Sequence, residues 1–136
     1  MGEMHVNYLA ILVAAILNMV IGAMWYGPML FAKQWMAWNN MTAEDMKKVN
    51  PGPLYAQSFF ATLVTYFVLA LILRNMNATS PVEGMKTAFM VWLGFITTVQ
   101  FTANLFSSKK IQSYFLDTGY QLVTMLIAGI VLSVWQ

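Results

Sequence analysis

The sequence contains no cysteine, one histidine and few charged side chains. Without cysteine there can be no disulfide, no thiol nucleophile and no thiolate metal site, and His5 alone leaves little to hold a transition metal. Seven Lys and Arg against five Asp and Glu give a net charge of +2. That excess is too small to bind a nucleic-acid backbone. We therefore expect no metal, no cofactor and no nucleic-acid partner.

Catalytic motifs are also missing from the sequence. No glycine-rich phosphate loop is present, and Glu44 and Asp45 stand in a loop without a plausible pocket. His5 has no Ser or Cys partner at an informative spacing. The 12 methionines follow no regular spacing, which favours packing residues over copper ligands. We expect a protein that is not an enzyme.

Apolar residues are what the sequence has in excess. They make up 60% of the 136 residues, and charged residues make up 9%, against about 45–50% and about 25% in soluble domains. About 20 apolar residues suffice to cross about 30 Å of hydrocarbon. The chain offers four such segments, over about residues 6–26, 54–73, 84–106 and 111–135. The predicted fold is an all-α integral membrane protein of one domain, residues 1–136, with four transmembrane helices in an up-down bundle.

Local signals mark the ends of these segments. Gly27-Pro28 is typical of a helix end, and Asn50-Pro51-Gly52-Pro53 separates the first loop from the second span. Ser80-Pro81-Val82-Glu83 has the order of a helix start, with a capping Ser, a Pro at the first position and a Glu three residues after the cap. Thr42 to Asp45 is a weaker capping box for a short helix through Lys48. The N-terminus lacks the basic region of a signal peptide, so we expect the first span to be retained.

The first loop contains an amphipathic segment over about residues 28–39. Wound as a helix, it gathers its aromatic residues on one face and Lys33 and Gln34 on the other. We expect an interfacial helix whose indoles lie at headgroup depth. A gate or a partner-docking element is the alternative. The predicted interfacial anchors are Trp25, Tyr26, Phe31, Trp35 and Trp38.

The distribution of basic residues predicts the orientation. The first and third loops together hold five lysines, and the opposite side holds Arg74 and Lys86. Because basic loops tend to stay in the cytoplasm, loops 27–53 and 107–110 are predicted to be cytoplasmic and both termini to be outside. The five lysines are Lys33, Lys47, Lys48, Lys109 and Lys110.

Each span places its polar or small residues on one stripe with helical spacing, which indicates that four stripes point inward. Interhelical hydrogen bonds and small residues hold helices together in lipid, so the stripes are explained by packing alone or by a polar site. The stripes are Asn7, Ala14, Asn18 and Gly22; Ser58, Thr62 and Thr65; Thr97, Gln100 and Asn104; and Asp117, Gln121, Thr124 and Ala128.

Asp117 is the residue that packing explains least well. It lies about two turns inside the fourth span, where an ionised carboxylate costs a few kcal/mol or more unless it is paired or hydrated. One interpretation is a proton-coupled site or a handle for a small ligand, and the other is a structural Asp near its helix N-terminus. The candidate partners are Lys109, Lys110, Tyr120, Gln121, Asn18 and Asn104. The possible polar intramembrane site comprises Asp117, Tyr120, Gln121, Asn18, Gln100 and Asn104.

Two stretches resemble a known bacterial membrane family, domain of unknown function 1761. The first runs from Gly22 through Trp25-Tyr26-Gly27-Pro28 to Met36, and the second is Leu116-Asp117-Thr118-Gly119-Tyr120-Gln121-Leu122-Val123. The resemblance covers nearly the whole chain and implies the four-span layout and a location in a bacterial inner membrane. It implies no activity.

Two functions fit the sequence. The favoured hypothesis is a small protein that binds or transports a small solute or protons through a polar interior around Asp117. The alternative is an accessory or structural subunit of a larger membrane complex, for which Gly129 and Ser133 offer a small-residue outer face. Besides the lipid bilayer, the expected partners are further copies of the chain, in a homo-oligomer, or that larger complex.

Overall fold

The computed structural model describes residues 6–27, 30–48, 51–107 and 110–136, apart from the side chains of Ala43, Met46 and Pro51. Within these ranges every regular element is a helix. The predictions made for Pro28, Asn50 and Lys109 lie outside the described residues. The elements are α1 (Tyr8–Trp25), α2 (Ala32–Trp38), α3 (Ala43–Lys48), α4 (Pro51–Asn75), α5 (Pro81–Val91), the π-helix η1 (Trp92–Thr97), α6 (Thr98–Ser107) and α7 (Ile111–Val134).

Four of the helical stretches are long and apolar enough to cross a membrane, as the sequence predicted. The second begins earlier than the predicted residue 54, because α4 already starts at Pro51. Proline is tolerated in the first turn of a helix, where its missing N–H has no intrahelical partner. The four stretches are Tyr8–Trp25, Gly52–Asn75, Pro81–Ser107 and Ile111–Val134.

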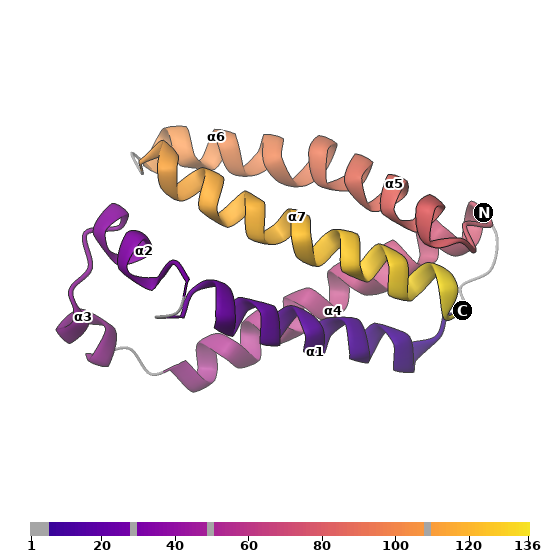
Figure 1. Cartoon of the computed structure of the whole chain (residues 1–136), viewed down its shortest axis with the longest axis horizontal. Coiled ribbons are helices and arrows are strands. Elements are labelled where there is room, and N and C mark those ends of the chain that lie inside the picture. Colours follow the sequence, from indigo (N-terminus) through magenta and orange to yellow (C-terminus); the bar gives the residue numbers. More distant parts are fainter. Residues whose placement is uncertain (1–5, 28–29, 49–50, 108–109) are drawn as a thin grey trace.

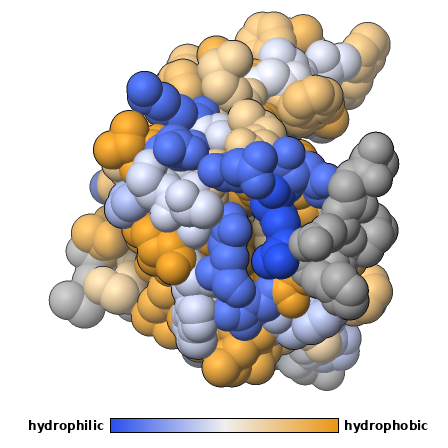
Figure 2. Space-filling view, turned by 90° about the vertical axis from the view of Figure 1, so that its right-hand side faces the viewer, coloured by the Kyte–Doolittle hydropathy of each residue, from blue (hydrophilic) through white to orange (hydrophobic). Residues whose placement is uncertain are grey.

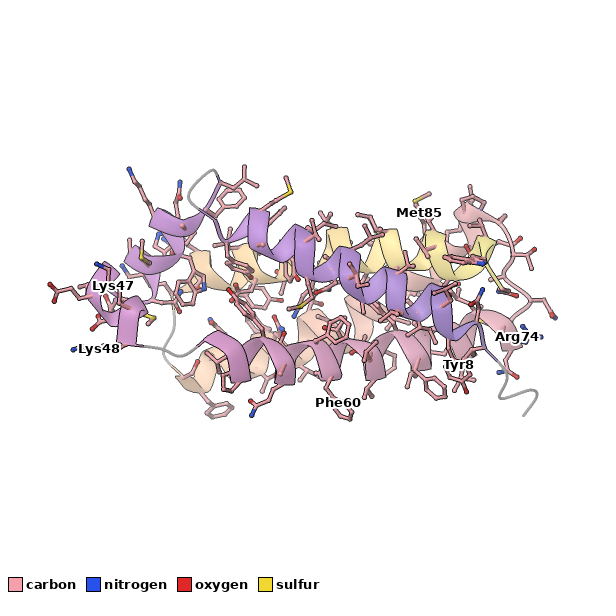
Figure 3. All side chains as sticks on the ribbon, turned by 90° about the horizontal axis from the view of Figure 1, so that it is seen from below. Tyr8, Lys47, Lys48, Phe60, Arg74 and Met85 are labelled. Carbon is pink, nitrogen blue, oxygen red and sulfur yellow. The ribbon has the colours of Figure 1, made fainter. Side chains whose placement is uncertain are left out.

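The long helices lie roughly side by side, with the first and last described residues, Val6 and Gln136, at one end of the molecule and α2 and α3 at the other (Figure 1). Figure 3 shows the same separation, with Lys47 and Lys48 at one end and Tyr8, Arg74 and Met85 at the opposite end. Figure 2 looks onto the end with the termini, where hydrophilic residues gather across the middle and apolar residues flank them. At this end of the molecule, polar groups thus gather between apolar ones.

The predicted helix starts are confirmed by their hydrogen bonds. The Ser80 hydroxyl accepts from the Glu83 N–H at 3.2 Å, and Pro81 occupies the first turn of α5. At the start of α3, the Asp45 N–H donates to the hydroxyl of the preceding Thr42, and the Thr42 N–H donates to the Asp45 carboxylate. These bonds from Thr42 lower the pKa of Asp45. Local sequence therefore determines where these helices begin.

The buried core occupies only part of the bundle. In α1 the buried residues lie between Ala10 and Ala15, and in α4 they begin at Tyr66. In the third long stretch, Gly84 and Ala88 are buried, whereas η1 and α6 contain no buried residue. We call the end with the termini the packed half and the end with α2 and α3 the open half. Among the described residues, α7 is the one helix with buried residues along most of its length, and it contacts α1, α2, α4, α5, η1 and α6.

The closest helix contact joins α5 to α7 in the packed half. A Cβ atom added to Gly84 would collide with the backbone of Gly129, and one added to Gly129 would collide with the backbone of Gly84. Ser133 is 2% exposed beside them. The predicted outer face of Gly129 and Ser133 is therefore wrong. These small residues let α5 approach α7 within the chain, so they are covered.

One element was not predicted from the sequence. The third long stretch is interrupted by the π-helical turns of η1, which carry one extra residue in each hydrogen-bonded ring. The Trp92 indole at its start donates to the carbonyl oxygen of Thr118 on α7 at 2.9 Å. Since π-helical segments shift the register of a helix, η1 changes which face of the third stretch meets α7. No feature of the hydrophobic pattern marks this shift.

Candidate functional site

Asp117 and Tyr26 form a short hydrogen bond at the start of the open half. The Tyr26 hydroxyl, at the C-terminal end of α1, donates to the Asp117 Oδ1 at 2.6 Å. The neighbouring Trp25 indole donates to the carbonyl oxygen of Leu116 at 3.2 Å. Hydrogen bonds to an ionised carboxylate are short and about twice as strong as neutral ones. The Trp-Tyr pair thus fixes the end of α1 to α7 and orients the carboxylate.

The carboxylate lies at the wall of a cavity of about 680 Å³, which we call the carboxylate cavity. Its volume falls within the range of about 300–1,000 Å³ found for small-molecule sites. Asp117 is the only lining residue with an ionisable carboxylate or a basic group among the described residues. The lining residues come from α1, α2, α4 and α7 and are Met19, Gly22, Ala23, Tyr26, Ala32, Trp35, Met36, Tyr55, Ser58, Asp117 and Tyr120.

Aromatic rings form much of this wall. The Tyr26 ring lies edge-on to Trp35, with ring centroids 6.4 Å apart, and edge-on to Tyr120, with centroids 5.4 Å apart. Tyr120 fits against α1 because Gly22 has no side chain: an added Cβ would be 2.8 Å from the Tyr120 hydroxyl oxygen. Edge-to-face contacts of this kind are a favoured arrangement of aromatic pairs and stabilise the positions of the rings. The cavity therefore combines one carboxylate with several fixed aromatic rings.

Asn18 connects three helices beside this cavity. The Tyr120 hydroxyl donates to the Asn18 Oδ1 at 2.6 Å, and the Asn18 Nδ2 donates to the Tyr66 hydroxyl at 2.9 Å. Tyr66 in turn donates to the carbonyl oxygen of Thr124 at 3.4 Å. Because these residues come from α1, α4 and α7, the chain of bonds ties the bundle together where the packed half meets the open half.

A second cavity, of about 430 Å³, lies on the other side of Tyr120 and Ser58, which line both cavities. We call it the amide cavity, because its polar groups are amides and hydroxyls. The Gln121 Oε1 is buried and has no hydrogen-bond partner among the described residues. The remaining polar lining residues are Asn18, Thr62, Thr65, Tyr66, Gln100 and Thr124.

The structure brings together most of the residues nominated from the sequence. Asp117 and Tyr120 line the carboxylate cavity, whereas Asn18, Gln100, Gln121 and again Tyr120 line the amide cavity. Asn104 lines neither cavity. Asn18, proposed as a partner of Asp117, bonds to two tyrosines instead.

Sequence reasoning missed several residues of the carboxylate cavity. Tyr26 and Trp35 were predicted only as interfacial anchors, yet both line the cavity and Tyr26 donates to Asp117. Tyr55 was not nominated at all. The resemblance to the Trp-Tyr-Gly-Pro signature was the one available signal, because it singled out Tyr26 together with Asp117. The signature alone could not show that Tyr26 donates to Asp117, because the two residues are 91 positions apart in the sequence.

The short helix α2 forms one wall of the carboxylate cavity. Ala32, Trp35 and Met36 line the cavity, and α2 has no buried residue of its own. Its C-terminal end is held by Asn39, whose Nδ2 donates to the Ser113 Oγ of α7 at 3.0 Å. Phe31 packs against Trp25, with ring centroids 5.1 Å apart, and Trp38 is half-buried. The helix thus covers the cavity from the loop end.

These features define a small protein whose described part is all-helical, with four helices long and apolar enough to cross a membrane and polar cavities between them, as in a multi-pass membrane protein. Among the described residues, no group of three His, Asp or Glu side chains is placed to hold a metal ion. The family model described as "Protein of unknown function (DUF1761)" matches residues 9–133, and the chain belongs to this family. No curated protein and no solved structure matches the chain.

Proposed function

We propose that the chain crosses a bacterial inner membrane as an up-down bundle and binds a small solute in the carboxylate cavity, without catalysing a reaction. The observation that carries this proposal is the placement of Asp117 at the wall of a cavity of about 680 Å³. A carboxylate used only for helix packing would be expected in a closely packed contact, because an open cavity forfeits packing energy. Intramembrane carboxylates facing a cavity are commonly functional.

The uneven packing supports access from one end. The open half contains the carboxylate and amide cavities. In the described packed half there is a separate hollow of about 460 Å³ at Met85, Phe89 and Leu126, which has no carboxylate in its lining, and a crevice of about 10 Å³ next to Asn7 and Arg74. That crevice has room for about one water molecule. A solute could therefore reach Asp117 from the end with α2 and α3. Transport across the bilayer would additionally require the α5 and α7 contact to open.

Solute binding is better supported than proton conduction. A proton relay needs a continuous chain of groups that can both accept and release protons. The chain from Tyr120 to Tyr66 passes through the Asn18 amide, which accepts on Oδ1 and donates from Nδ2 but does not release a proton at ordinary pH. The hydrogen bonds around Asn18 are thus suited to holding helices together.

Cysteine accessibility in membranes tests the proposal, since the chain has no cysteine of its own. Ala23→Cys and Ser58→Cys lie at the carboxylate cavity and should react with a water-soluble methanethiosulfonate reagent, because the thiolate forms only where water enters. Ala14→Cys, which is 2% exposed in the packed half, should stay unlabelled. Phe60→Cys should also stay unlabelled: Phe60 is exposed and points away from the bundle (Figure 3), and we propose that this face contacts lipid.

Two outcomes of this experiment would contradict the proposal. Unreactive cysteines at both cavity positions would mean a dry interior, as expected for an accessory or structural subunit. Rapid labelling of Phe60→Cys would mean that this face contacts water rather than lipid. A homo-oligomer or a larger membrane complex remains a prediction, and the internal use of Gly129 removes the small-residue face on which the subunit hypothesis relied.

The orientation gives a further prediction. We propose that both termini are outside and that loops 27–53 and 107–110 are cytoplasmic, because the lysine excess lies in these loops. Impermeant thiol reagents applied to intact cells should label cysteines placed at Ser80 and Gln136. Cysteines at Asn50 and Lys109 should react only after the membrane is opened. The reverse pattern would invert the orientation and leave the four spans unchanged.

A further inference from the structure

We infer that the solute of the carboxylate cavity is a hydrophobic organic cation with a single positive charge, such as a lipophilic amine or a quaternary onium ion. The inference rests on the proposed function and names the class of its ligand. It combines three features of the described lining: its charge, its aromatic rings and its apolar surface.

Charge decides the sign of the ligand. Asp117 is the only charged side chain among the described lining residues, and a hydrogen bond from Tyr26 holds it in place. An ionised group in a low-dielectric site is stabilised strongly by one opposite charge and destabilised by a like charge. A monocation therefore complements this cavity, whereas an anion of the same shape would be repelled by the carboxylate.

The aromatic rings favour an organic cation. Tyr26, Trp35, Tyr55 and Tyr120 line the cavity together with the carboxylate. Cations near the faces of Trp and Tyr rings are attracted by the ring quadrupole, which is the usual means of recognising quaternary ammonium groups. Met19 and Met36 add polarisable thioethers that adapt to ligands of different shape.

A metal ion fits this cavity poorly. Calcium takes about six to eight oxygen ligands and magnesium about six. Asp117 is the one carboxylate in the described lining, and the other oxygens are hydroxyls of Ser58 and three tyrosines. Most of the remaining lining is apolar. A large, weakly hydrated cation loses far less hydration than a metal ion on entering such a site.

Three probes of the same shape separate charge from hydrophobicity: tetraphenylphosphonium, tetraphenylborate and uncharged tetraphenylmethane. Binding to the full chain in nanodiscs of zwitterionic lipid would be followed by the fluorescence of its tryptophans, with empty nanodiscs as the blank. We expect wild-type protein to bind the phosphonium at least about tenfold more tightly than either other probe, because only the cation gains from the carboxylate.

Asp117→Asn should weaken phosphonium binding by about tenfold or more and leave tetraphenylmethane binding unchanged. Glu83→Gln is the matched control, since it removes the same charge at the start of α5 in the packed half and should not alter binding. If Asp117→Asn fails to fold, Trp35→Leu replaces it and should weaken phosphonium binding by about threefold or more, and by more than it weakens binding of the neutral probe, because only the cation also loses a cation–π contact.

The result that would overturn the cation inference is equal binding of the three probes, or no binding of any, in a protein whose Ala23→Cys and Ser58→Cys variants are labelled. In that case the cavity would still be hydrated, so the proposed function would be retained and only the identity of the ligand would be wrong. Unlabelled cysteines would instead remove the cavity and both proposals with it.

Discussion

Gly129→Ala is expected to lower the free energy of unfolding by about 2–3 kcal/mol, the cost of an extra methyl group in a closely packed contact. The new Cβ would be 2.9 Å from the Ala88 Cβ and closer still to the carbonyl oxygen of Gly84. Backbone atoms cannot rotate away as the end of a side chain can, so α5 and α7 would have to separate. The higher helix propensity of Ala offsets about 1 kcal/mol at most.

Gly94→Ala is the matched control for this substitution. Gly94 lies in η1, and no atom outside its own helix turn and chain neighbours is within 4 Å of the position that a Cβ would take. The same methyl group meets no neighbour here, so Gly94→Ala should not destabilise the protein and should gain at most about 1 kcal/mol from helix propensity. Reversible unfolding in bicelles measures both variants. Equal stability of Gly129→Ala and wild type would show that α5 and α7 do not meet at these glycines.

Asn18→Leu is expected to destabilise the protein by about 2 kcal/mol, because it removes two interhelical hydrogen bonds, worth on average about 0.6 kcal/mol each in a bilayer, and leaves a buried hydroxyl with fewer partners. Asn18 accepts from Tyr120 and donates to Tyr66. The loss of stability exceeds the free energy of the hydrogen bonds themselves. Tyr66 is only 1% exposed, so its hydroxyl would lose a partner that water cannot replace.

A double-mutant cycle with Tyr66→Phe identifies the source of this effect. Tyr66→Phe keeps the ring and removes the hydroxyl, so it should cost about 1 kcal/mol by itself. If Asn18 and Tyr66 act through their shared bond, the double variant should be more stable than the sum of the two single effects predicts, by about 0.5 kcal/mol or more. Strict additivity would mean that the two side chains do not interact, and that Asn18 does not join α1 to α4.

The two stability experiments also bear on the proposed function. The α5 and α7 contact closes the packed half, and the Asn18 bonds form the boundary between the packed and open halves. A variant that loosens either contact should increase labelling of Ala14→Cys, because water would then enter the packed half. Stability and access to the interior are thus properties of the same contacts.

The sequence alone predicted the elements that local chemistry determines. Apolar segments long enough to cross a bilayer predicted the four long helices. The capping pattern of Ser80, Pro81 and Glu83 predicted the start of α5. The cost of a carboxylate in a span singled out Asp117, and helical spacing placed Gln121 and Asn18 on inward stripes. These inferences hold because each depends on residues within a few turns of one another.

Only the tertiary structure decided how these helices meet. Small residues permit close approach to any neighbour, so Gly129 could not reveal whether its partner was Gly84 of the same chain or another protein. Tyr26, at the end of one span, gave no local sign that it donates to Asp117, 91 residues away. The cavities depend on where packing stops between helices, and this is a property of their relative positions, which hydrophobic periodicity does not specify.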